Sequence, residues 1–156
     1  LAKWNEHHPS PVYAYIRHAY WPLRFHFSDY QFIRKLDGQN PGNRVVITQN
    51  DAFDQWIANH YSLICHKEAK LVIGVNEPIE EDILLREDNV IQVTCSTETK
   101  KYVDKIFRQL HGLTDLFKLH FLNALKENQL DITVTVSRNP VLAKLMREKI
   151  KGYFGE

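Results

Sequence analysis

Two short apolar runs joined by four polar residues constrain the fold of this chain most strongly. Asp82–Leu85 and Val90–Cys95 each have the composition of a β-strand, and the polar residues Arg86–Asn89 between them are suited to a turn. We therefore expect an antiparallel hairpin in the middle of the chain, and we interpret the neighbouring segments around it.

The segments before the hairpin predict a strand, a helix and a further strand. Val45–Thr48 is a short β-branched run, and Asn50 or Asp51 is placed to cap a helix whose apolar residues recur at near-helical spacing. Leu71–Val75 has the continuous apolar character of a buried strand.

The segments after the hairpin predict helix, strand and helix. Ser96 or Thr97 is placed to cap a helix with one apolar stripe, and residues 132–136 alternate Ile or Val with Thr, which is typical of a strand. Asn139-Pro140 is suited to begin a last helix. From residue 51 onward the expected order is helix, three strands, helix, strand, helix.

The first 45 residues differ in composition, because they hold four of the six prolines and many of the aromatic residues. We expect a short helix from about Pro11 to Tyr20, capped by Ser10, and a strand at Leu23–Phe27. A chain of 156 residues suits one hydrophobic core. We therefore expect a single α/β domain, with an aromatic-rich N-terminal extension (1–45) packed on a core (46–156).

Only two cysteines are present, too few for the disulfide framework of a small secreted domain, which favours a reducing compartment, cytoplasmic or nuclear. No apolar stretch approaches the length of a membrane span, so no membrane partner is expected. The chain begins with Leu1, and its single methionine is Met146. We therefore expect a longer protein whose other domains are partners of this one.

The small net charge of +1 conceals a segregation of charge along the chain. Residues 1–45 carry a net +3, residues 46–90 a net −6 and residues 91–156 a net +4. An acidic middle between basic flanks is typical of a carboxylate-rich metal site framed by phosphate-binding surface, but ordinary solvated faces that alternate in sign are the preferred interpretation.

The expected order of elements, with its hairpin, resembles the core of the PD-(D/E)xK restriction-endonuclease-like superfamily. In that family an Asp begins the second strand, and an acidic residue or Gln, one further residue and a Lys lie on the third. The matching positions here are Asp82 and Gln92-Val93-Thr94, so Thr94 stands where the family has its Lys. The separation of Asp82 from Gln92 predicts that both side chains point to one site.

The resemblance implies phosphodiester hydrolysis assisted by Mg²⁺, with Asp82 as the principal ligand and catalytic residue and Gln92 as its support. Glu68 is a candidate third ligand for the metal. Lys100 or Lys101, at the start of the following helix, is the candidate replacement for the missing Lys.

Basic residues provide candidates for binding DNA or RNA. Lys100, Lys101, Lys105 and Arg108 recur at helical spacing and are expected to project together toward phosphates. In the N-terminal segment, Arg24, Arg34 and Lys35 lie among aromatic residues that could stack on bases.

Other signatures of catalysis are absent from the sequence. The eight histidines include no i, i+4 pair of the kind that holds zinc on a helix, and we interpret them as ordinary surface or half-buried residues. There is no glycine-rich phosphate loop, which argues against nucleotide hydrolases. Three functions stay open: a Mg²⁺-dependent nuclease, a nucleic-acid-binding module without cleavage, and a protein-interaction or scaffolding domain.

Overall fold

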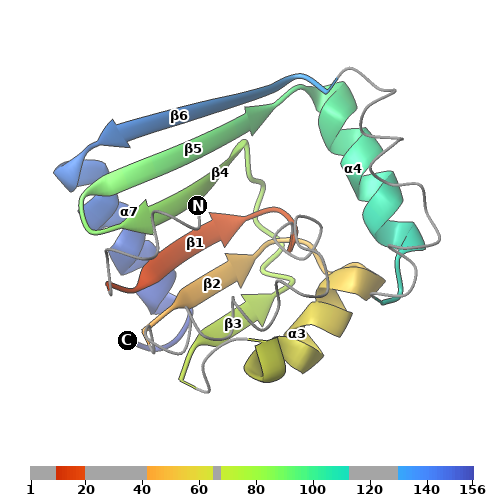
Figure 1. Ribbon diagram of the computed structural model, residues 1–156, viewed down its shortest axis with the longest axis horizontal. Helices are drawn as coiled ribbons and strands as arrows, with labels where there is room; N and C mark the ends of the chain where they lie inside the picture. Colours follow the sequence, from red (N-terminus) through yellow and green to blue (C-terminus); the bar gives the residue numbers. More distant parts are fainter. Residues whose placement is uncertain (1–9, 20–41, 65–67, 113–129) are drawn as a thin grey trace.

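A computed structural model of the chain describes residues 10–19, 42–64, 68–112 and 130–156 (Figure 1). The strands are β1 (Val12–Ile16), β2 (Arg44–Ile47), β3 (Lys70–Ile73), β4 (Glu81–Arg86), β5 (Asn89–Cys95) and β6 (Ile132–Arg138). The helices within the described ranges are α3 (Ala52–Ile64), α4 (Thr97–Gln109) and α7 (Pro140–Gly152).

The strands form one six-stranded mixed sheet in the order β3-β2-β1-β4-β5-β6 (Figure 1). The strands β1, β2 and β3 run parallel to one another. The other half of the sheet is antiparallel, since β4 pairs with both β1 and β5, and β5 pairs with β6. The C-terminal ends of the three parallel strands therefore lie at the same edge of the sheet as the start of β4.

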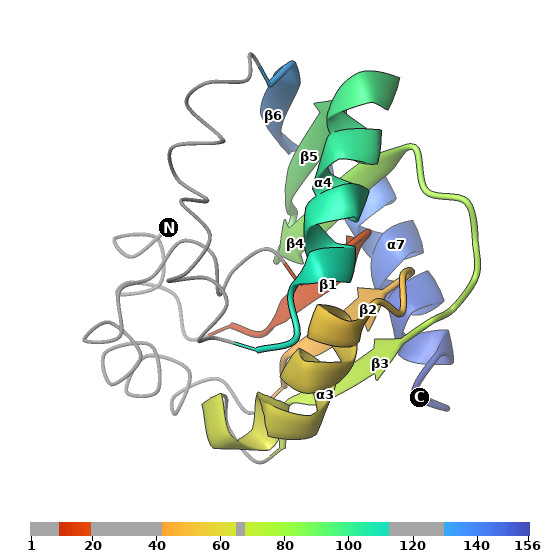
Figure 2. The same cartoon turned by 90° about the vertical axis from the view of Figure 1, so that its right-hand side faces the viewer.

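Helices pack on both faces of the sheet, and side chains alternate between the two faces along each strand. On one face, Ala14 and Ile16 of β1 belong to a buried cluster with Phe53 of α3 and Phe107 of α4. On the other face, Tyr13 and Tyr15 of β1 and their neighbours on β2, β4 and β5 pack with residues of α7, which lies behind the sheet in Figure 1. Figure 2 shows α4 above α3, at the end of the sheet where the parallel strands finish.

Most of the secondary structure expected from residue 44 onward is confirmed. The order from α3 to α7 is helix, three strands, helix, strand, helix, and β4 and β5 form the predicted hairpin. The α/β class is confirmed, whereas a restriction-endonuclease-like core is not. The strand that precedes the hairpin, β3, is an outer strand of the sheet, and β2 and β1 separate it from β4.

The prediction of a helix from Pro11 to Tyr20 is wrong, because residues 12–16 form β1 in the middle of the sheet. A central strand is buried on both faces, so its sequence is apolar throughout and lacks a two-residue alternation. The segment 1–45 was expected to be an extension, yet β1 is central and residue 45 lies within β2. The strand expected at Leu23–Phe27 lies outside the described residues.

Within the described ranges, no helix has the length and apolar character needed to cross a membrane.

Candidate functional site

Charged side chains gather at the edge of the sheet where the parallel strands end. Ligand sites in α/β sheets commonly lie at this edge, beyond the carboxyl ends of the strands. Four elements contribute residues here: the end of β1, the start of α3, the start of β4 and the middle of α4. The residues are Arg17, His18, Asp51, Asp54, Asp82 and Asp104, and we call them the edge cluster.

His18 is the centre of the edge cluster and is fully buried. Its Nδ1 lies 2.9 Å from Oδ2 of Asp54, and its Nε2 lies 2.9 Å from Oδ1 of Asp104. The ring also stacks on Phe107, with 4.1 Å between the ring centroids. Asp54 belongs to α3 and Asp104 to α4, so the imidazole ties both helices to the end of β1.

The backbone next to His18 is held by the same carboxylates. The N–H of Ala19 donates to Oδ1 of Asp54 at 2.9 Å, which occupies the second oxygen of this fully buried side chain. Arg17 makes two bonds to Asp104, from Nε at 2.8 Å and from Nη2 at 2.7 Å. Burial of Asp104 favours its neutral form, but the hydrogen bonds from Arg17 and His18 outweigh that effect and lower its pKa.

Asp82 is the predicted site residue that does lie in the cluster. Its Oδ1 accepts a hydrogen bond from the backbone N–H of Arg17 at 2.7 Å, and its exposed fraction is 9%. Burial raises its pKa to about 6, against the opposing effects of the Arg17 hydrogen bond and of the charges on His18 and Arg17. The charge of Lys100 also lowers the pKa of Asp82 weakly. The Nζ of Lys100 itself donates to the carbonyl of Glu80 at 2.6 Å.

Asp51 is the most exposed carboxylate around His18, with 22% of its side chain accessible. It lies 3.9 Å from Nδ1 of His18 and 4.0 Å from Nε of Arg108. Burial raises its pKa, although the charge of His18 opposes the shift. The edge cluster is therefore partly accessible to solvent at Asp51.

Three residues of the cluster have the geometry of a partial metal shell. One ligand atom from each of His18, Asp51 and Asp54 can be chosen so that all lie within 4.8 Å of one another. Asp104 would then accept from Nε2 of His18, as an outer carboxylate does behind many metal-bound histidines. One imidazole and two carboxylates suit a transition metal such as Mn²⁺ or Zn²⁺ better than the all-oxygen preference of Mg²⁺.

The prediction that Asp82 and Gln92 point to one site is wrong. The register of the hairpin pairs Asp82 with Val93, and Gln92 with Ile83. Directly paired residues share a face, so Asp82 and Gln92 project from opposite faces of the sheet. The amide of Gln92 instead donates to Oε1 of Glu81 at 3.0 Å.

Glu68 is also separate from Asp82. It precedes β3, at the edge of the sheet where the parallel strands begin, and its backbone carbonyl accepts from Arg44. Asp82 lies at the opposite edge, so the structure does not assemble the shell expected from Asp82, Gln92 and Glu68. Asp82, Gln92 and Glu68 therefore cannot be common ligands of one Mg²⁺ ion. Binding of Mg²⁺ elsewhere on the chain stays a prediction.

The basic residues expected to bind phosphate fall into two groups. Lys101, Lys105 and Arg108 are exposed on α4, where positions i, i+4 and i+7 share one face. Lys100 is half-buried beside them. The other three candidates, Arg24, Arg34 and Lys35, lie outside the described residues.

The sequence analysis did not predict His18, Asp54 and Asp104 as partners. His18 was interpreted as an ordinary surface or half-buried histidine, whereas it is fully buried and bonded on both sides. The missed signal is that His18 is the second residue after a strand, and this signal could be used only once residues 12–16 are known to form that strand.

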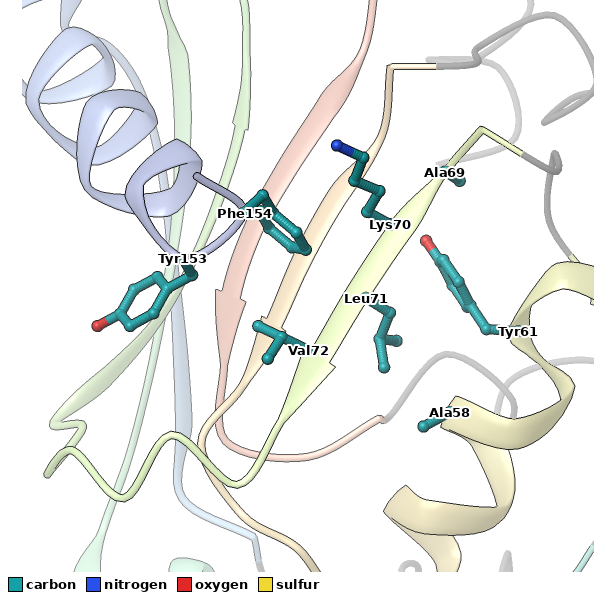
Figure 3. A pocket seen from close by; sticks show the side chains of 8 residues that line it. All are labelled: Ala58, Tyr61, Ala69, Lys70, Leu71, Val72, Tyr153 and Phe154. Atoms are coloured by element: carbon teal, nitrogen blue, oxygen red, sulfur yellow. The ribbon is translucent and has the colours of Figure 1, made fainter. Parts of the chain in front are cut away.

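A separate shallow hollow of about 470 Å³ lies between α3, β3 and the end of the chain (Figure 3). Alanine, leucine, valine and phenylalanine make up more than half of its lining residues, and the labelled side chains of Tyr61, Leu71 and Phe154 surround it. The ammonium group of Lys70 is bonded to Oε1 of Glu156 at 2.7 Å. The hollow therefore lacks the convergent polar groups of a ligand site.

Comparisons with known proteins find a likeness among solved structures. No family model matches the chain, and no curated protein matches it. Among solved structures, the chain is similar to TrmBL2, an archaeal chromatin protein whose structure shows a novel mode of DNA binding, at 11% identity and a TM-score of 0.49. The match covers 99% of this chain and 46% of the other, so the chain spans about half of that protein's length. A likeness at this level supports no assignment of function.

Proposed function

We propose that this domain binds nucleic acid through the exposed basic face of α4. The observation that carries the proposal is the exposed row of Lys101, Lys105 and Arg108, which we call the α4 basic row. At the rise of an α-helix, the row places three cations along about 10 Å of one face. A row of cations attracts a phosphate backbone without regard to base sequence.

The charges of the α4 basic row are largely available to a ligand. Within the described part of the chain, neither Lys101 nor Lys105 has a side-chain partner, and the nearest carboxylate to Arg108 lies at 4.0 Å. Such an exposed and distant ion pair contributes little and yields readily to a phosphate.

The fold fixes the position of α4, because other residues of the helix are anchored. Ile106 and Phe107 are buried in the core, and Asp104 is bound by both Arg17 and His18. The first turn is capped by Ser96, whose hydroxyl accepts from the N–H of Thr99 at 3.2 Å. A helix fixed in this way presents its cations with little further loss of conformational freedom on binding.

Phosphodiester cleavage has weaker support than binding. Ligands of a catalytic Mg²⁺ must be ionised and must converge, whereas Asp82 and Gln92 lie on opposite faces and burial raises the pKa of Asp82 to about 6. Metal-dependent cleavage by this domain therefore requires another set of ligands, and His18, Asp51 and Asp54 are the candidates that the described residues offer.

The test is a binding and cleavage assay with labelled single-stranded and duplex DNA and RNA. Each substrate is incubated with the protein in EDTA, in Mg²⁺ and in Mn²⁺, and both mobility shift and product formation are measured. We expect a shift in all three conditions and no product. Absence of any shift at low salt would overturn the proposal, and metal-dependent product abolished by Asp51→Asn would assign catalysis to the edge cluster.

A further inference from the structure

The strand β6 forms one border of the sheet among the described residues (Figure 1). Its seven residues pair without interruption with β5, from Ile132 opposite Cys95 to Arg138 opposite Asn89. No other described strand pairs with its outer side. That side therefore presents backbone N–H and C=O groups in the arrangement that a further strand would recognise.

The outer strand lacks the features by which proteins usually block such an edge. Residues 132–137 include no proline and no charged residue, and the register with β5 shows no bulge. Three apolar side chains on one face are exposed, at 46% for Ile132, 59% for Val134 and 68% for Val136. An unprotected edge with an apolar face is a surface for strand addition.

We propose that the strand added to β6 is the β6 of a second copy of this chain, paired antiparallel about Thr135. In that register all seven residues pair, and each central pair joins like with like. Val134 lies opposite Val136 of the second copy, Thr133 opposite Ser137, and Thr135 opposite itself. Such β-branched and hydroxyl pairs are favourable across antiparallel strands, and no like charges are directly opposed.

The alternation of β6 also excludes neighbouring registers. A shift of one residue would set Val134 opposite Thr135 and would mix the apolar face with the polar one. A shift of two residues keeps the faces matched but leaves fewer pairs within the strand. The symmetry of the sequence about Thr135 is what favours a second copy over an unrelated partner, because an isologous interface requires self-complementarity.

The proposal is tested by sedimentation of the protein and of variants at Thr135. We expect the unmodified protein to be dimeric at about 100 µM, a concentration well above the dissociation constant of a specific interface. Thr135→Lys and Thr135→Glu, each alone, place two like charges directly opposite on the symmetry axis and should be monomeric. An equimolar mixture of the two variants should restore a dimer, since Lys then faces Glu.

A matched control is Val141→Lys, which adds the same charge at a position on α7 that is 71% exposed and lies off the β6 edge. This variant should remain dimeric. A monomeric unmodified protein, a dimer that survives Thr135→Lys, or a mixture of the two charge variants that stays monomeric would overturn the proposal. Circular dichroism of each variant checks that the fold is retained, and the outcome does not depend on nucleic-acid binding.

Discussion

Replacing Asp82 by Asn is expected to make the protein more stable near neutral pH. The carboxylate is 9% exposed and accepts the backbone N–H of Arg17 at 2.7 Å. The amide oxygen of Asn is placed to accept the same bond, and the substitution removes a charge that burial disfavours. The variant therefore isolates the cost of ionising Asp82 inside the fold.

The size of the effect follows from the pKa of Asp82. Burial raises it from 3.8 to about 6, and each pK unit corresponds to about 1.4 kcal/mol. The pKa of Asp82 is higher in the folded state than in the unfolded state. The stability that this group contributes to the folded protein is therefore fully present below about pH 4, and it is lost as the pH rises through about 6. Between about pH 4 and pH 8, the stability of Asp82→Asn relative to the unmodified protein should rise by about 3 kcal/mol.

Urea denaturation of both proteins at several pH values from about 4 to 8 measures this difference. Asp131→Asn, at an exposed carboxylate just before β6, is the matched control and should show no comparable rise. The reasoning is refuted if the difference between Asp82→Asn and the unmodified protein is constant with pH, or if the variant becomes relatively less stable as the pH increases.

Two further predictions concern His18 and the metal. His18→Ala removes the buried imidazole that bonds to both Asp54 and Asp104, while Asp54 keeps its bond from the Ala19 N–H and Asp104 keeps those from Arg17; it should lower the free energy of unfolding by about 3 kcal/mol, measured by urea denaturation. No loss would contradict the bridging role of the ring. Mn²⁺ or Zn²⁺ bound at His18, Asp51 and Asp54 should raise Tm, by the equivalent of about 2.7 kcal/mol at a concentration of 100 times Kd. Asp51→Asn should abolish that rise, and an equal rise in the variant would place the metal elsewhere.

Local signals were sufficient to predict most elements of the second half of the chain. The hairpin of β4 and β5 follows from two apolar runs and a short polar turn, and the turn is formed within the hairpin itself. Ser96, one of the two caps expected for α4, caps that helix, and α7 begins at Asn139-Pro140 as expected, with Asn139 as its cap. A cap bonds to a residue three positions away. These features depend only on nearby residues and need no knowledge of the sheet.

The elements that the sequence analysis missed depend on contacts between distant residues. Residues 12–16 are apolar on both faces because β1 is central, and that position is determined by pairing with strands 28 or more residues away. The partners of His18 lie 36 and 86 residues along the chain. The error at Asp82 and Gln92 came from register, because a ten-residue separation does not determine which strand positions face each other.

The measurement that tests the account most directly is the salt dependence of nucleic-acid binding by the α4 basic row. Binding of labelled duplex DNA is measured between about 50 and 200 mM salt for the unmodified protein, for Lys101→Ala, Lys105→Ala and Arg108→Ala combined, and for the control Lys144→Ala on α7. The slope of log affinity against log salt should become shallower by about 0.9 for each phosphate contact that the combined variant loses, and should be unchanged in the control. An unchanged slope and affinity in the combined variant would contradict the proposal that α4 binds nucleic acid.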